Sequence, residues 1–106
     1  MLETAPSLVR LVKDPTLSRV LDMHPEVGPA LEKLEAAIRA DSRLRGASVV
    51  EASYPDPETG AFRHVTVSVA GHSLGHEDSM EIMETLDGLL RDLNADSLIS
   101  VDVGPA

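Results

Sequence analysis

The pattern of apolar and polar residues predicts an α+β fold, a two-layer sandwich in which helices pack on one face of a three-stranded mixed sheet. Two segments, 29–40 and 76–93, carry apolar side chains at helical spacing. Two strand-like runs, 47–54 and 61–69, flank a turn, and a third run alternates over residues 97–103. We therefore expect N-terminal helices followed by strand, strand, helix and strand.

The first 24 residues are predicted to form a helical extension to a core at residues 25–106, within one domain of 106 residues. A second helix of this extension follows Asp14 and Pro15, an acceptor cap with proline at the first helical position. The first helix begins near Thr4 and carries the apolar residues Leu8, Val9, Leu11 and Val12.

Pro29 decides where the long helix of the core begins. It has no amide hydrogen for the carbonyl group four residues back, so it does not suit the interior of a helix that begins at Pro25. We place the start near Gly28 and the end near Ala40. The face that packs on the sheet then carries Ala30, Leu31, Leu34, Ala37 and Ile38.

A β-hairpin follows, because the sequence PDPETG between the first two strands is typical of a turn and Gly60 can adopt a positive φ. In the second strand Val65, Val67 and Val69 point to one face. The polar residues of the three strands are expected on the opposite face, which an antiparallel sheet can leave in water. They are Glu51, Ser53, His64, Thr66, Ser68, Ser100 and Asp102.

The helix at 76–93 joins the hairpin to the last strand. Its apolar residues Met83, Leu86 and Leu90 recur at helical spacing. A helical crossover of this kind allows the last strand to pair in parallel with the second strand of the hairpin.

This order of elements resembles a known family. From ALEKLEAAIRADSRLRGASVVEAS through FRHVTVSVAG to MEIMETLDGLLRDLNADSLISVDV, residues 30–103, the chain is similar to the C-terminal domain of the enhanced-serine-sensitivity protein family. The likeness lies in the pattern of helix, two strands, helix and a terminal strand that ends near an Asp. The resemblance implies a non-enzymatic domain. The family has no established catalytic residues, so none is carried over.

Composition limits the possible functions. The formal net charge of −9 disfavours binding to nucleic acid or to anionic membranes, since both need clustered Lys and Arg. The chain has no Cys, which excludes disulfides, thiolate metal sites and a thiol nucleophile. It has no apolar run near the ~20 residues of a membrane span and no features of a secretory signal, so we expect a cytoplasmic protein.

The segment GHSLGHEDSM, residues 71–80, holds the densest group of chemically capable side chains. His72 and His76 lie about one helical turn apart, close enough to share a metal ion with Glu77 as a third ligand. The alternative interpretation is the start of a helix, where Glu77 and Asp78 meet the positive end of the helix dipole. The HEXXH arrangement of zinc proteases is absent.

A second candidate site is a ligand-binding surface of His64, Thr66 and Ser68 on the polar face of the sheet, although such residues are often merely exposed. The sequence contains none of the nucleophile-elbow, phosphate-loop or dinucleotide motifs, so we predict no catalytic residue and no cofactor.

We expect a small non-catalytic protein-interaction module that self-associates, as a homodimer or larger homo-oligomer. One alternative is an acidic inhibitor or immunity-type protein that binds a basic partner, which the net charge suggests. Another is a metal-binding or histidine-dependent enzyme centred on residues 72–78.

Overall fold

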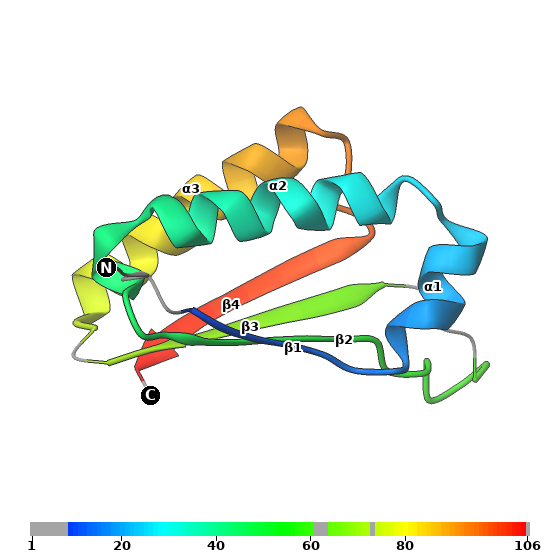
Figure 1. Ribbon diagram of the computed structural model, residues 1–106. Coiled ribbons are helices and arrows are strands. Elements are labelled where there is room, and N and C mark those ends of the chain that lie inside the picture. The colour runs from blue at the N-terminus through cyan, green and yellow to red at the C-terminus, as the bar shows by residue number, and fades with distance from the viewer. Residues whose placement is uncertain (1–8, 61–63, 73, 106) are drawn as a thin grey trace, which may run out of the picture.

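The computed structural model describes residues 9–60, 64–72 and 74–105. They form an α+β fold with two layers (Figure 1). The helices α2 (Val27–Ala40) and α3 (His76–Asp92) lie side by side over one face of the sheet. No helix of the described residues covers the opposite face, which we call the open face.

The sheet has four strands rather than the three expected. Their spatial order follows the sequence, β1-β2-β3-β4. The central pair β2 and β3 is antiparallel, as the hairpin predicted, and each outer pair is parallel. The bounds are β1 Arg10–Lys13, β2 Ser48–Ala52, β3 Val65–Gly71 and β4 Ile99–Pro105.

The additional strand β1 corrects the helix expected from Thr4 onward. Its four residues pair in register with β2, from Arg10 beside Ser48 to Lys13 beside Glu51. The alternation of Val9 and Leu11 with outward-facing neighbours fits a strand as well as a helix, and pairing with β2 decides between them. The predicted start of that helix lies outside the described residues. The second predicted helix is present as α1 (Leu17–Met23), at one end of the sheet (Figure 1).

The two helical connections have opposite hands. Both connections lead to the next strand in the same direction across the sheet, from β1 to β2 and from β3 to β4. However, the strands of the first pair run antiparallel to those of the second pair. Since α2 and α3 cover the same face, one connection must be left-handed, against the strong preference for right-handed crossovers. The first connection contains two helices, α1 and α2, and the second contains α3 alone.

The core lies between the sheet and the two long helices. Helix α2 begins at Val27, so Pro29 falls in its first turn, where backbone amides have no helical partner. None of the helices in the described part of the chain is long and apolar enough to cross a membrane. Among the most deeply buried side chains are Leu34 and Ile38 of α2, Leu86 and Leu90 of α3, and Val49, Val65 and Val67 of the sheet.

Two of the polar residues expected in water lie on the core face instead. Register places Glu51 beside Val67, and both side chains are fully buried. Ser53 is also buried, and its hydroxyl group donates to the carbonyl oxygen of His64 at 2.6 Å. The adjacent Val49 and Val50 made either phase of β2 possible from sequence. Pairing of Val49 with Val69 turns Val50 to the open face and Glu51 to the core.

The strand at residues 10–13 predicts an alternating pattern of amide protection. The Arg10 and Asp14 amides donate to the carbonyl oxygens of Ala47 and Glu51, both at 2.9 Å. Strand alternation turns the Val12 amide to the same side, whereas the Leu11 and Lys13 amides face away from β2. Hydrogen exchange followed by NMR should therefore be slow at Val12 and fast at Leu11 and Lys13. Uniform protection of all three amides would indicate a helix and contradict the strand.

Candidate functional site

The histidine-rich segment forms the start of a helix. Helix α3 begins at His76 after Gly75 as N-cap, with Glu77 and Asp78 in its first turn. His72 is exposed beyond the end of β3, and His76 and Glu77 are exposed on α3. Among the described residues no group of three His, Cys, Asp or Glu side chains is placed to hold a metal ion. The predicted His72–His76–Glu77 metal site therefore gains no support.

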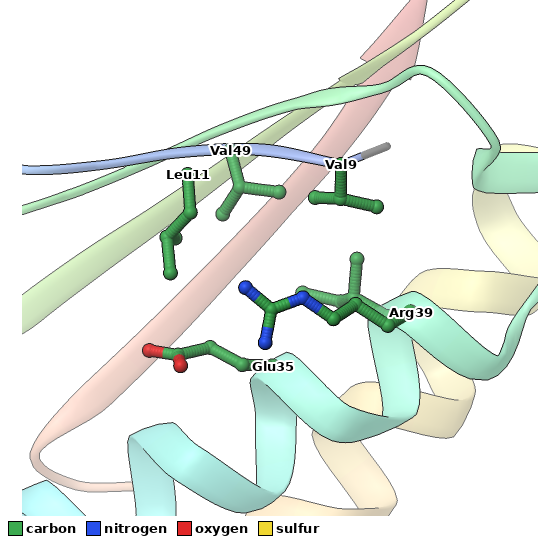
Figure 2. Close-up of a pocket in the computed structure, with 6 residues that line it drawn as sticks. Val9, Leu11, Glu35, Arg39 and Val49 are labelled. Carbon is green, nitrogen blue, oxygen red and sulfur yellow. The ribbon is translucent and has the colours of Figure 1, made fainter. Parts of the chain in front are cut away.

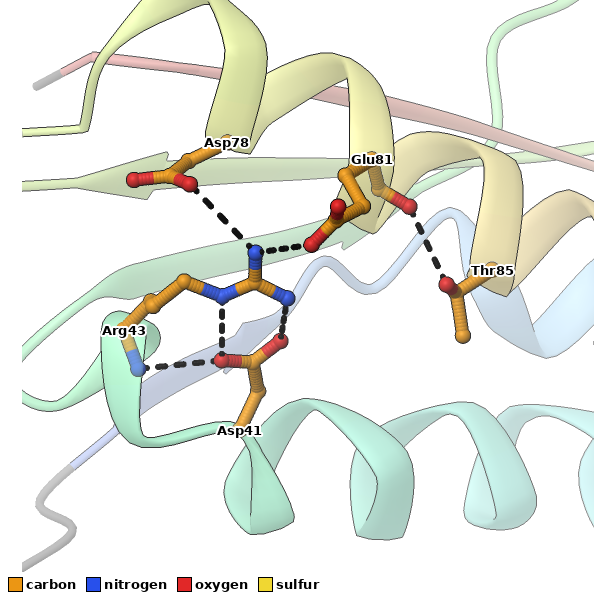
Figure 3. A network of polar contacts seen from close by, with 5 residues as sticks. All are labelled: Asp41, Arg43, Asp78, Glu81 and Thr85. Carbon is orange, nitrogen blue, oxygen red and sulfur yellow. Dashed lines mark hydrogen bonds and ion pairs between the residues drawn. The ribbon is translucent and has the colours of Figure 1, made fainter.

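The acidic first turns of α3 are tied instead to Arg43, in the 3₁₀ turn Ser42–Leu44 (Figure 3). The guanidinium group donates to both carboxylate oxygens of Asp41, at 2.9 and 3.0 Å. It also donates to Glu81 at 2.5 Å and contacts Asp78 at 3.4 Å. Hydrogen bonds from Arg43 lower the pKa of the Asp41 carboxyl group, and Asp41 and Glu81 raise the pKa of Arg43. This network joins the end of α2 to α3 and has the character of a structural link.

The second predicted site falls on the open face. Strand alternation puts Thr66 and Ser68 there, with Thr66 half-buried and Ser68 exposed, and His64 is exposed just before β3. The described strand residues that share this face are Arg10, Val12, Ser48, Val50, Ala52, Thr66, Ser68, Ala70, Ser100, Asp102 and Gly104.

The open face combines exposed apolar and small polar side chains. Val12 and Val50 are neighbours in register and are 54% and 39% exposed, and Ser68 continues the same row. Arg10 on β1 and Asp102 on β4 are its two charged residues, so the face itself is neutral. The whole net charge of −9 therefore lies on the rest of the chain.

The core face holds an unusual feature, a pair of carboxyl groups between α2 and β2. Glu51 is 0% exposed and Glu35 of α2 is 9% exposed. Neither carboxylate oxygen of Glu51 has a hydrogen-bond donor when both groups are ionised. Glu35 has one charged partner, because the Lys13 ammonium group lies 3.5 Å from its Oε2 atom. A buried carboxylate without a donor is strongly disfavoured, so protonation is the simplest way to stabilise this arrangement.

The pKa of Glu51 is raised to about 8, chiefly by burial and then by the neighbouring Glu35, which acts as a hydrogen-bond partner and as a like charge. The positive charges of Lys13 and Arg39 act in the opposite direction. A proton on Glu51 supplies the missing donor for Glu35. At neutral pH the two carboxyl groups therefore share one proton.

A shallow hollow lies next to this pair, between β1 and α2 (Figure 2). Figure 2 shows Glu35 and Arg39 reaching up from α2 toward Val9, Leu11 and Val49 of the strands. The hollow has a volume of about 170 Å³ including its opening to solvent.

Sequence reasoning missed the residues that make these two regions distinctive. Val12 belongs to the segment expected to be a helix and Glu51 is expected in water, whereas the structure places Val12 on the open face and Glu51 in the core. A signal existed for Glu51: Val49 and Val50 precede it directly, so a strand covered on one face can turn either valine inward. Glu35 reads as an ordinary exposed helix residue until β1 covers it.

Comparison with family models, with curated proteins and with solved structures gives no match to this chain.

The raised pKa of Glu51 predicts how the stability of the protein depends on pH. The folded pKa of about 8 exceeds the ordinary value of 4.5, so the folded state holds the proton more tightly. The stabilisation is fully present below pH 4.5 and is lost as the pH rises through about 8, by about 1.4 kcal/mol per pH unit at most. Glu51→Gln keeps the shape and supplies a donor without titrating. The stability of this variant relative to the unmodified protein should therefore be higher at pH 9 than at pH 5.

Urea denaturation at several pH values measures this difference. The matched control is Glu84→Gln on the exposed side of α3, which should leave the pH dependence between pH 5 and 9 unchanged. Parallel stability curves for Glu51→Gln and the unmodified protein would show that Glu51 does not carry the buried proton.

Proposed function

We propose that the protein is a small, non-catalytic interaction module that acts in the cytosol and binds through the open face of its sheet, with a second copy of itself as the first partner. The observation that carries this proposal is the pair of exposed valines, Val12 and Val50, which are neighbours on the sheet face that no described helix covers. Burying them against another surface contributes about 25 cal/mol per Å² of apolar area.

The distribution of charge supports contact between two copies. Two molecules with a net charge of −9 each repel one another, and the repulsion is weakest where the contacting surfaces are neutral. The open face meets this condition, because Arg10 and Asp102 cancel. Neither of them has an ion pair with another described residue.

The resemblance to the enhanced-serine-sensitivity C-terminal domain belongs to the same proposal. Residues 30–103, which carry it, cover most of α2, the hairpin, α3 and most of β4. A non-enzymatic role for that domain agrees with an interaction module.

The outer side of α3 supports a second candidate function, binding of a basic partner protein. Helix α3 has six acidic residues and one basic residue, Arg91, and five of the six acids are exposed. Arg43 neutralises part of this surface through Asp78 and Glu81. Binding at α3 would weaken steeply as the salt concentration rises, whereas binding at the neutral open face would depend little on salt.

A single substitution on the open face should abolish self-association. Val50→Lys places a charge at the centre of the face and lowers the net negative charge, so a weaker dimer cannot be attributed to added repulsion. We expect the dissociation constant measured by sedimentation velocity to rise about tenfold or more, as for a central interface residue.

The control is Met80→Lys, which makes the same charge change at a 48% exposed apolar residue on α3. It should leave self-association intact. A strict monomer at high micromolar concentration for the unmodified protein, or equal weakening by both variants, would contradict the proposal. A circular dichroism spectrum confirms that each variant is folded.

A further inference from the structure

We propose that Glu35 and Glu51 form a proton-binding site that controls the docking of β1, so that β1 stays on the sheet while the pair shares a proton and is released when both groups are ionised. This inference goes beyond the proposed function and does not depend on it. Its basis is the placement of an unpartnered, fully buried carboxyl group directly beside the shortest strand of the sheet.

Protonation is the way in which this buried pair becomes neutral in place. Glu51 is enclosed by β1, β3 and α2. The charged or titratable groups facing it are Lys13 from β1 and Glu35 and Arg39 from α2, and its neighbour on β3 is Val67. Lys13 is engaged with Glu35 rather than with Glu51. Ionisation therefore leaves Glu51 without a donor, next to a second negative charge.

Strand β1 is the element that is displaced when both carboxyl groups are ionised. Within the described part of the chain it is an edge strand of four residues, with β2 as its one pairing partner. Three of its four residues are exposed and Leu11 is only half-buried, and the Lys13 side chain is 55% exposed. The other strand beside Glu51, β3, is held on both sides, by β2 and β4. Displacing β1 admits water to Glu51 at the lowest cost in buried contacts.

Release of β1 would expose an edge of β2. The backbone groups of β2 that pair with Arg10–Lys13 would become a free strand edge, which is a ready docking site for an extended segment of another chain. Release also removes Arg10 and Val12 from the open face. The proton would thus set which surface of the module is available.

Trypsin provides a direct test, because it cleaves after Arg10 and Lys13 within β1. Limited proteolysis of the full chain between pH 7 and 9, with fragments identified by mass spectrometry, reports the opening of this strand. Dividing each rate by that of Glu51→Gln under the same conditions removes the pH dependence of trypsin. We expect the ratio at Arg10 and Lys13 to rise about tenfold over this range. Arg39 in α2 and Arg91 in α3 serve as internal controls and should keep a constant ratio.

Glu35→Gln provides a second variant, since it removes the like charge and leaves one titrating carboxyl group. We expect it to flatten the rise at the β1 sites. A constant ratio at Arg10 and Lys13 would overturn the proposal. An equal rise at Arg39 and Arg91 would also overturn it, because the carboxyl pair would then affect the whole fold and not the docking of β1.

Discussion

The architecture depends on one constraint: both helical connections return over the same face of the sheet. Parallel strand pairs need a crossover, and here α2 and α3 provide the cover for the outer pairs and together bury one apolar surface. The opposite face is left with small, polar and β-branched side chains and without a helix. The hydrophobic core is therefore complete with two layers, and the open face is a surface that the fold produces but does not use.

The same arrangement accounts for the buried carboxyl pair. Strand β1 adds to the edge of β2 and closes the space above Glu51, so a side chain that would otherwise reach water becomes enclosed. An apolar residue at this position would pack without a titrating group. Because Glu51 lies opposite Glu35, the docking of β1 depends on a proton held by this pair. The edge strand β1 thus differs from the central strands, whose pairing does not depend on that proton.

The elements with long periodic patterns followed directly from sequence. The hairpin, α3 and β4 are local or joined by one helix, and alternation and helical spacing locate them within a few residues. The helix start at residues 76–78 also followed from sequence, because acidic residues suit a first helical turn. Strand β1 could not be found this way, because four residues that pair with a segment more than 30 positions away leave no local signal.

The candidate sites could be predicted from the sequence only in part. Thr66 and Ser68 were correctly placed on an open polar face, because the valines of β3 fix its phase. Val50 and Glu51 were exchanged between the two faces, because the phase of β2 is set by pairing with Val69 and not by its own pattern. The exposed valines and the buried acid thus share one origin, the register of β2.

The most direct test of the central claim is to locate the self-association surface by NMR. Amide and methyl spectra recorded over a dilution series report which residues change environment as copies associate. We predict concentration-dependent shifts at Val12, Val50, Ser68 and Asp102, with the exposed side of α3 unaffected. Shifts confined to α3, or spectra that do not change with concentration, would contradict a role for the open face.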